Sequence, residues 1–222
     1  MSVRTKNLKA VCNVRSVDPV RPEPVIMREA AEQIRSGWVV VFPTTGLYGL
    51  GADALDPEAV DRVFDIKQRP ANNPLLVLID HRDQVTRLAR RVPRLAEILM
   101  ERFWPGGVTI VFEARPGLPE NLTAGTGKIG IRMPGHPVAR ELVNVAGMPI
   151  TGTSANLSGR PGCFDITQLD PSIMQGAALV LDAGALKGGP GSTVIDVTRE
   201  GGRILRHGAV SESEIRAALY GI

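Results

Sequence analysis

Residues 38–51 read Trp-Val-Val-Val-Phe-Pro-Thr-Thr-Gly-Leu-Tyr-Gly-Leu-Gly and join an apolar run to a glycine-rich stretch. The run 38–42 is mostly β-branched, which is typical of a strand buried on both faces, and Pro43 ends it. The stretch 44–55 that follows is predicted to be a loop, because glycines and hydroxyl side chains interrupt its apolar residues. Sheets of this kind bind ligands in loops beyond the strand ends, so 44–55 is the first candidate for a site.

Helices are predicted on both sides of this strand and loop. The apolar spacing over 26–36 places one hydrophobic face toward a core. After the loop, Asp56 is a good N-cap and Pro57 suits the first helical position. Pro70 disfavours helical geometry in the residue before it, which predicts the end of this second helix near Lys67.

The rest of the chain alternates between short apolar runs and helical patterns. Strands are predicted at 75–79, 108–112, 129–132, 149–151, 179–182 and 193–197, and helices at 81–91, 93–103, 137–146 and 211–219. Ser211 and Glu214 form a capping box at the start of the last helix. This order predicts an α/β fold with one twisted, mixed sheet flanked by helices. We expect a single domain over residues 24–222 and a basic N-terminal arm over residues 1–23.

The composition is that of a globular protein, with 222 residues of which 43% are hydrophobic and 22% charged. No apolar run is long enough to span a membrane, and the basic N-terminal segment contains no apolar signal region. We therefore expect a cytoplasmic protein with no membrane contact. The two cysteines, Cys12 and Cys163, and three isolated histidines predict neither a disulfide framework nor a metal site. A net charge of +3 is compatible with nucleotide or RNA partners.

Several common catalytic motifs are excluded by their context. Gly125, Gly127 and Gly130 match the spacing of a dinucleotide-binding loop, but a predicted strand follows them instead of a helix. Lys128 is followed by isoleucine, so there is no phosphate-binding loop of the Walker type. No nucleophile elbow of the form Gly-x-Ser-x-Gly occurs either.

Four separated stretches present hydroxyls, amides and cations next to predicted strand ends. They are Pro-Thr-Thr-Gly-Leu-Tyr-Gly-Leu-Gly at 43–51, Lys-Gln-Arg-Pro-Ala-Asn-Asn-Pro-Leu at 67–75, Ile-Arg-Met-Pro-Gly-His-Pro at 131–137 and Thr-Gly-Thr-Ser-Ala-Asn-Leu-Ser-Gly-Arg-Pro at 151–161. In this order they resemble the YrdC-like family. The resemblance extends to Trp-Pro-Gly at 104–106, Ser-Thr-Val-Ile-Asp at 192–196 and Arg-Ile-Leu-Arg at 203–206, and it covers roughly residues 24–211.

The resemblance implies a YrdC-like α/β fold with a deep basic groove and a nucleotidyltransferase activity. In that reaction ATP, with Mg²⁺, combines with bicarbonate and L-threonine to give threonylcarbamoyl-AMP and pyrophosphate. The adenylate would then pass to a tRNA threonylcarbamoyl transferase for N6-threonylcarbamoylation of adenosine 37. A direct contact with tRNA or double-stranded RNA is a further expectation.

The family pattern also assigns candidate roles to residues of this chain. For ATP the candidates are Lys67, Arg69, Asn73, Asn156 and Arg206, of which Lys67 and Arg69 would also be catalytic; for threonine they are Thr44, Thr45, Arg132, Ser154 and Ser192. A carboxylate that attacks a phosphate must approach another anion, so cations have to offset the repulsion. Alanine in place of Lys67 or Arg69 is therefore expected to abolish turnover and leave the melting temperature nearly unchanged. From the residues alone, both cations could instead be solvated charges at a helix C-terminus.

The chain departs from the family pattern mainly in the amino-acid half. Thr45 and Gly46 stand where the pattern has an acidic residue and a threonine, Leu78 stands where a histidine is common, and Lys128 replaces a small hydroxyl residue. Two alternatives therefore stay open. One is a carbamoyl-type adenylate made with another acceptor. The other is a non-enzymatic RNA-binding module, although an aromatic content of 4% leaves few side chains for base stacking.

Overall fold

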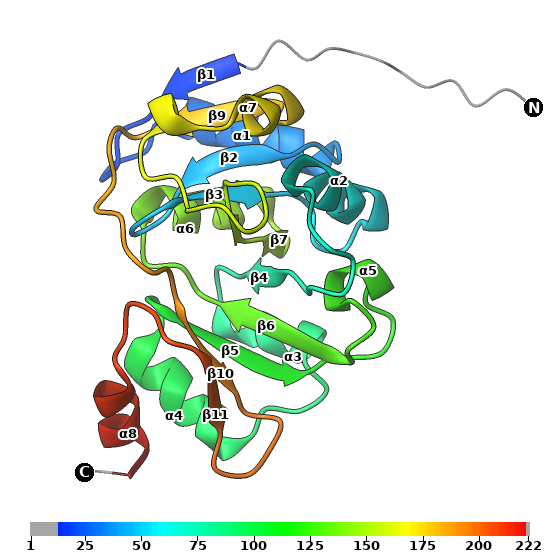
Figure 1. Ribbon diagram of the computed structural model, residues 1–222, viewed down its shortest axis with the longest axis vertical. Helices are drawn as coiled ribbons and strands as arrows, with labels where there is room; N and C mark the ends of the chain where they lie inside the picture. The colour runs from blue at the N-terminus through cyan, green and yellow to red at the C-terminus, as the bar shows by residue number, and fades with distance from the viewer. Residues whose placement is uncertain (1–12, 221–222) are drawn as a thin grey trace, which may run out of the picture.

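The computed structural model describes residues 13–220, and their strands form two mixed sheets, one above the other in Figure 1. The five-stranded sheet has the order β1 (Asn13–Ser16), β9 (Leu179–Asp182), β2 (Val40–Pro43), β3 (Tyr48–Gly51) and β8 (Thr153–Ser154). The six-stranded sheet has the order β11 (Arg203–Arg206), β10 (Thr193–Asp196), β5 (Val108–Glu113), β6 (Lys128–Arg132), β4 (Leu76–Leu78) and β7 (Ile150–Thr151). Parallel pairs, such as β2 with β9 and β4 with β6, occur beside antiparallel pairs in both.

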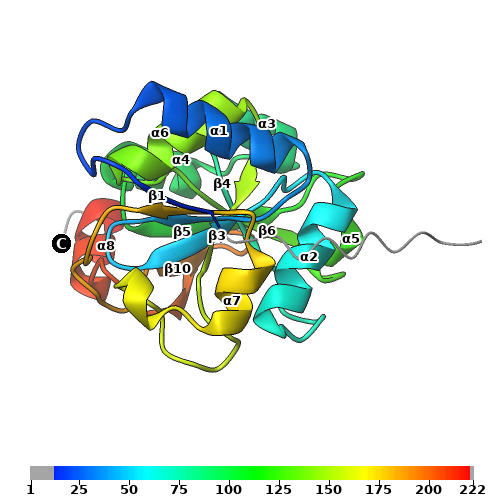
Figure 2. The ribbon, with the colours of Figure 1, turned by 90° about the horizontal axis from the view of Figure 1, so that it is seen from above.

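Strand β2 is buried on both faces, as its composition predicts. Val40 and Phe42 pack in a hydrophobic cluster with α1 (Pro24–Arg35) and α6 (Pro137–Ala146). Val41 belongs to the larger cluster, together with residues of α2 (Pro57–Lys67) and α7 (Pro171–Gly176). Figure 2 shows these two pairs of helices on opposite sides of the strands. The alternation of side chains along a strand thus joins the sheet to both helical layers.

The remaining helices lie mostly beside the six-stranded sheet. They are η1 (Arg82–Gln84), α3 (Val85–Leu88), α4 (Arg94–Phe103), α5 (Glu120–Thr123), η2 (Ile166–Gln168) and α8 (Glu212–Tyr220). The caps predicted for two helices are present. The Asp56 side chain accepts a hydrogen bond from the Glu58 amide, and Ser211 and Glu214 bond each other's backbone amides.

Several features differ from the sequence-based expectation. The strands divide between two sheets, where one sheet was predicted. The predicted loop 44–55 contains β3, and the predicted helix 81–91 is replaced by η1 and the short α3. Part of the expected N-terminal arm lies in a sheet, because β1 pairs in parallel with β9; residues 1–12 of that arm lie outside the described part of the chain.

The chain passes from one sheet to the other at Gly152. β7 ends at Thr151 in the six-stranded sheet, and β8 begins at Thr153 in the five-stranded sheet. A Cβ at Gly152 would lie 2.5 Å from Cγ of Leu78, so only glycine fits this crossing. The loop that carries the motif 151–161 therefore begins where the two sheets meet.

In the range 13–220, no helix is long and apolar enough to cross a membrane.

Candidate functional site

Two cavities open near this crossing and share part of their walls. One has a volume of about 530 Å³ and the other about 430 Å³. Leu76, Ser154 and Arg206 line both. The larger is called the nucleotide-side cavity below because Arg69 lines it, and the smaller the amino-acid-side cavity because it contains the residues predicted to contact threonine.

All five residues predicted for the threonine side line the amino-acid-side cavity: Thr44, Thr45, Arg132, Ser154 and Ser192. Four separate segments of the chain bring them there. Thr44 is held in a tight turn, in which its hydroxyl donates to the carbonyl of Leu47 at 2.5 Å. Gly46 and Leu78, where the chain departs from the family pattern, line the same cavity.

Arg132 is fixed in the wall of this cavity by the motif 104–106. Its Nε donates to the carbonyl of Gly106 at 2.6 Å, and only 9% of the residue is exposed. Burial, with a smaller contribution from the charge of Arg206, lowers the pKa of Arg132 to about 10. The guanidinium is therefore still protonated at neutral pH and has donors left for a carboxylate.

Arg206 lies at the centre of a group of cations. Its guanidinium donates to the carbonyl of Ser192 at 2.9 Å and to the hydroxyl of Ser192 at 3.1 Å. Its charge contributes, after burial, to lowering the pKa of both Arg69 and Arg132. A cation that lowers the pKa of a neighbouring cation is close enough to repel it, and an anionic ligand would relieve this repulsion.

Lys67 lies behind the site and joins two of its motifs. Its ammonium group donates to the carbonyls of Ser154 at 2.5 Å and Asn156 at 2.7 Å, while its own carbonyl accepts from the Ser158 amide at 2.9 Å. The residue is 1% exposed and lines neither cavity. Burial, with a smaller contribution from Arg69, lowers the pKa of Lys67 to about 7. Two of its three donors are thus committed to the loop 154–158.

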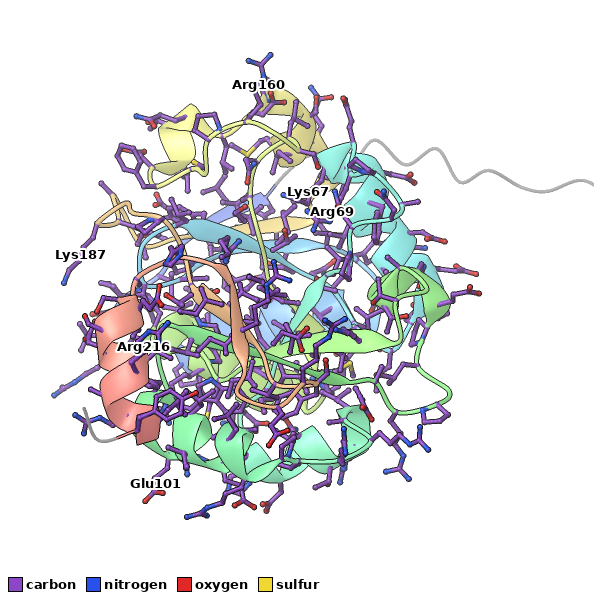
Figure 3. The ribbon with its side chains drawn as sticks, turned by 60° about the horizontal axis from the view of Figure 1, so that its bottom comes forward. Lys67, Arg69, Glu101, Arg160, Lys187 and Arg216 are labelled. Atoms are coloured by element: carbon purple, nitrogen blue, oxygen red, sulfur yellow. The ribbon has the colours of Figure 1, made fainter. Side chains whose placement is uncertain are left out.

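The other residues predicted to bind ATP do not all line the same cavity. Arg69 lines the nucleotide-side cavity and donates to the carbonyls of Asn73 and Pro74. Asn156 lines the amino-acid-side cavity, where its side chain accepts from the Ser154 hydroxyl. Asn73 is exposed and lines neither cavity. Figure 3 shows Lys67 and Arg69 close together, while Lys187 extends outward at the edge of the molecule.

The nucleotide-side cavity combines apolar walls with one ion pair. Its apolar residues include Pro74, Leu75, Leu76, Val111, Val194 and Leu205. Lys128 donates to Asp196 at 2.7 Å, and both residues line the cavity. Burial acts to raise the pKa of Asp196, but hydrogen bonds from Lys128 and Thr198 outweigh it and hold this pKa below its usual value. Apolar walls with a few fixed polar groups suit a nucleoside.

Sequence reasoning missed two parts of the site. Thr109 and Asp196 line the nucleotide-side cavity, and the Thr109 hydroxyl bonds that of Ser192 at 2.7 Å. Residues 187–191 line the amino-acid-side cavity. Asp196 belongs to the motif 192–196, so its place in that motif was a usable signal. For the glycine-rich segment before Ser192, the density of glycines in one loop was the only signal.

A metal site built by the protein itself is not found in residues 13–220, because no group of three or more histidine, cysteine, aspartate or glutamate side chains could hold an ion. A Mg²⁺ ion prefers few protein carboxylates and several phosphate or water oxygens. The residues of the site therefore fit an ion that enters with a nucleotide.

Comparison with known proteins identifies related sequences and structures. The family model Sua5/YciO/YrdC, described as "Telomere recombination", matches residues 32–208. The threonylcarbamoyl-AMP synthase of Pyrococcus abyssi is 38% identical over 209 residues, which are 94% of this chain and 60% of that protein. A Mycobacterium tuberculosis relative is 37% identical over 190 residues, covering 86% of this chain and 87% of the relative. The crystal structure of P. abyssi Sua5 complexed with L-threonine has a TM-score of 0.89 at 38% identity and covers 94% of this chain and 61% of that one.

The chain thus spans about three fifths of the length of the P. abyssi relative that it matches. It spans a larger share of the M. tuberculosis relative. The YrdC-like fold expected from the motifs is confirmed by these matches.

Proposed function

Because the chain belongs to the Sua5/YciO/YrdC family, we propose that it forms threonylcarbamoyl-AMP and pyrophosphate from L-threonine, bicarbonate and ATP. One observation carries this proposal. The cavity with the predicted amino-acid residues and the cavity with Arg69 meet at Ser154 and Arg206. Two anionic substrates can therefore meet beside one central cation.

The reaction requires only that these substrates be positioned and their charges balanced. The threonine amine and bicarbonate give a carbamate with loss of water. A carbamate oxygen then attacks the α-phosphorus of ATP, a new P–O bond forms, and the bond to the departing pyrophosphate breaks. No side chain has to take up a proton in that step. Arg206 and Arg69 offset the charge on the phosphates, and Arg132 pairs with the amino-acid carboxylate.

Mg²⁺ takes part in this proposal as a component of the substrate MgATP. It offsets charge on the phosphates when bound, and the residues of the site do not have to supply its ligands. The adenylate would serve a tRNA threonylcarbamoyl transferase in the cytoplasm. A direct contact with tRNA, and a catalytic domain that corresponds to residues 24–222, belong to the same proposal.

The deciding experiment supplies the purified protein with ATP, Mg²⁺, labelled bicarbonate and one amino acid at a time. Pyrophosphate release and a labelled acyl-adenylate that require threonine would support the proposal. Product with a different amino acid would favour the second candidate, an adenylate synthase with another acceptor. Leu78 and Gly46 in the wall of the amino-acid-side cavity are the observation that favours this candidate. Tight RNA binding without any product would leave only the RNA-binding module.

The binding of ATP is expected to weaken as the pH rises above about 7. The pKa of Lys67 is about 7 in the free protein, and the phosphates next to Arg69 would raise it. ATP therefore binds best when Lys67 is protonated, and binding above pH 7 takes up a proton. Calorimetry in two buffers of different ionisation enthalpy measures this uptake. Lys67→Met should remove the uptake that is due to Lys67; equal uptake by both proteins would contradict the assignment.

A further inference from the structure

A glycine-rich segment, residues 184–191, runs along one wall of the amino-acid-side cavity and is called the strap here. Gly184, Gly188, Gly189 and Gly191 all have positive φ values, between 72° and 117°. L-residues other than glycine rarely adopt this conformation. Residues 187–191 line the cavity. The strap is thus a part of the wall that is made largely of main chain.

Both ends of the strap are anchored. The hydroxyl of Tyr48 donates to the carbonyl of Gly184 at 2.6 Å. The amide of Leu186 donates to the carbonyl of Phe164 at 2.7 Å. Burial raises the pKa of Tyr48 to about 12, so this phenol remains a donor at neutral pH. At the other end, the Ala209 amide donates to the carbonyl of Gly191 at 2.8 Å.

The middle of the strap has one attachment. Over residues 187–190, its sole hydrogen bond to the rest of the described chain runs from the Gly188 amide to the carbonyl of Gly46, at 2.9 Å. Gly46 belongs to the turn that carries Thr44 and Thr45. Between the two anchored ends, this contact is therefore the one hydrogen bond that holds residues 187–190 against the turn.

Gly46 makes the contact possible because it has no side chain. A Cβ at this position would lie 2.3 Å from the carbonyl oxygen of Gly188, which is backbone and has no rotamer to change. Gly46 is not among the glycines with positive φ, so alanine would not be strained there by a left-handed backbone. The substitution would act through its collision with the strap.

We propose that Gly46 is a positioning residue that seats the strap against the amino-acid end of the site and thereby sets how tightly the acceptor amino acid is held. The identity of the ligand rests on the proposed function, but the contact between Gly46 and the strap does not. The strap lines the cavity that holds Arg132 and is absent from the lining of the nucleotide-side cavity. Its displacement should therefore affect the amino acid far more than ATP.

Gly46→Ala is expected to raise the KM for the acceptor amino acid about tenfold and to change the KM for ATP less than twofold. The same variant should expose the strap to trypsin, which cleaves after Lys187, and mass spectrometry would measure a faster cut at this bond. In the wild type, saturating ATP and amino acid should slow that cut.

A double variant separates the contact from general damage to the turn. In a protein from which Gly188 and Gly189 are deleted, adding Gly46→Ala should have no further effect on the KM for the amino acid. If Gly46→Ala leaves both the KM for the amino acid and the rate of cleavage after Lys187 unchanged, the inference is wrong. The proposed synthase activity could still be correct in that case. If instead no adenylate forms with any amino acid, the proposed function fails, while faster cleavage of Gly46→Ala would still support the contact.

Discussion

Replacing Arg206 with glutamine is expected to lower the rate of adenylate formation at least about 100-fold, the usual cost of losing a preorganised charge at a transition state. Arg206 lines both cavities and its charge acts on Arg69 and Arg132. Without it, the carbamate and the α-phosphate would approach each other without the cation that lines both cavities. Pyrophosphate release at saturating substrates measures the effect.

The matched control is Arg216→Gln. Arg216 lies on α8, where it forms an exposed ion pair with Glu212 at 2.7 Å. An exposed pair of this kind contributes little to stability, so both activity and melting temperature should stay near the wild-type values. More than a tenth of the wild-type rate in Arg206→Gln, with the fold intact, would contradict the central role of Arg206.

Replacing Lys67 with methionine is expected to reduce both stability and activity. The change leaves the carbonyls of Ser154 and Asn156 without their buried donor, and one such group costs about 1–3 kcal/mol. We expect the free energy of unfolding to fall by about 2 kcal/mol, or roughly 4–8 °C in melting temperature for a chain of this size. Activity should fall about 100-fold, because the loop 154–158 supplies Ser154 and Asn156 to the site.

From the sequence, a substitution at Lys67 was expected to leave the melting temperature nearly unchanged. The hydrogen bonds of Lys67 to the loop 154–158 change that expectation. For Arg69→Ala the original expectation stands, because its bonds are to the exposed backbone of Asn73 and Pro74. Denaturant unfolding of both variants separates the two cases, with Arg102→Met, an exposed cation on α4, as the control for loss of charge. A Lys67→Met protein as stable as the wild type would show that the bonds to the loop contribute nothing.

The sequence predicted best the elements whose signals are local. Helix α6 was placed at its observed bounds, and the capping box of α8 is present. Strand β3 was missed because two of its four residues are glycines, which strands usually avoid. The structure explains Gly51: a Cβ there would lie 2.8 Å from the ring of Phe42 on the neighbouring strand. That reason is a tertiary contact and is invisible in the local pattern.

For the site, the motifs identified most of the lining residues but could not show which atoms face the cavities. The burial of Lys67 could have been predicted from the sequence, because Val60 and Val63 precede it by seven and four residues on the buried face of α2. Asn73 illustrates the opposite case. It lies in a motif of the family, yet nothing in the amino-acid sequence shows that this residue lines neither cavity.

The crossing at Gly152 implies that bound substrates would connect the two sheets. Ser154 follows the crossing by two residues, and the two cavities adjoin there, each with strands of both sheets in its walls. A molecule that occupies both cavities is therefore a brace between two layers that the backbone joins by a single glycine at this point. The adenylate of the proposed reaction would occupy both cavities and should hold the layers together more firmly than either substrate alone.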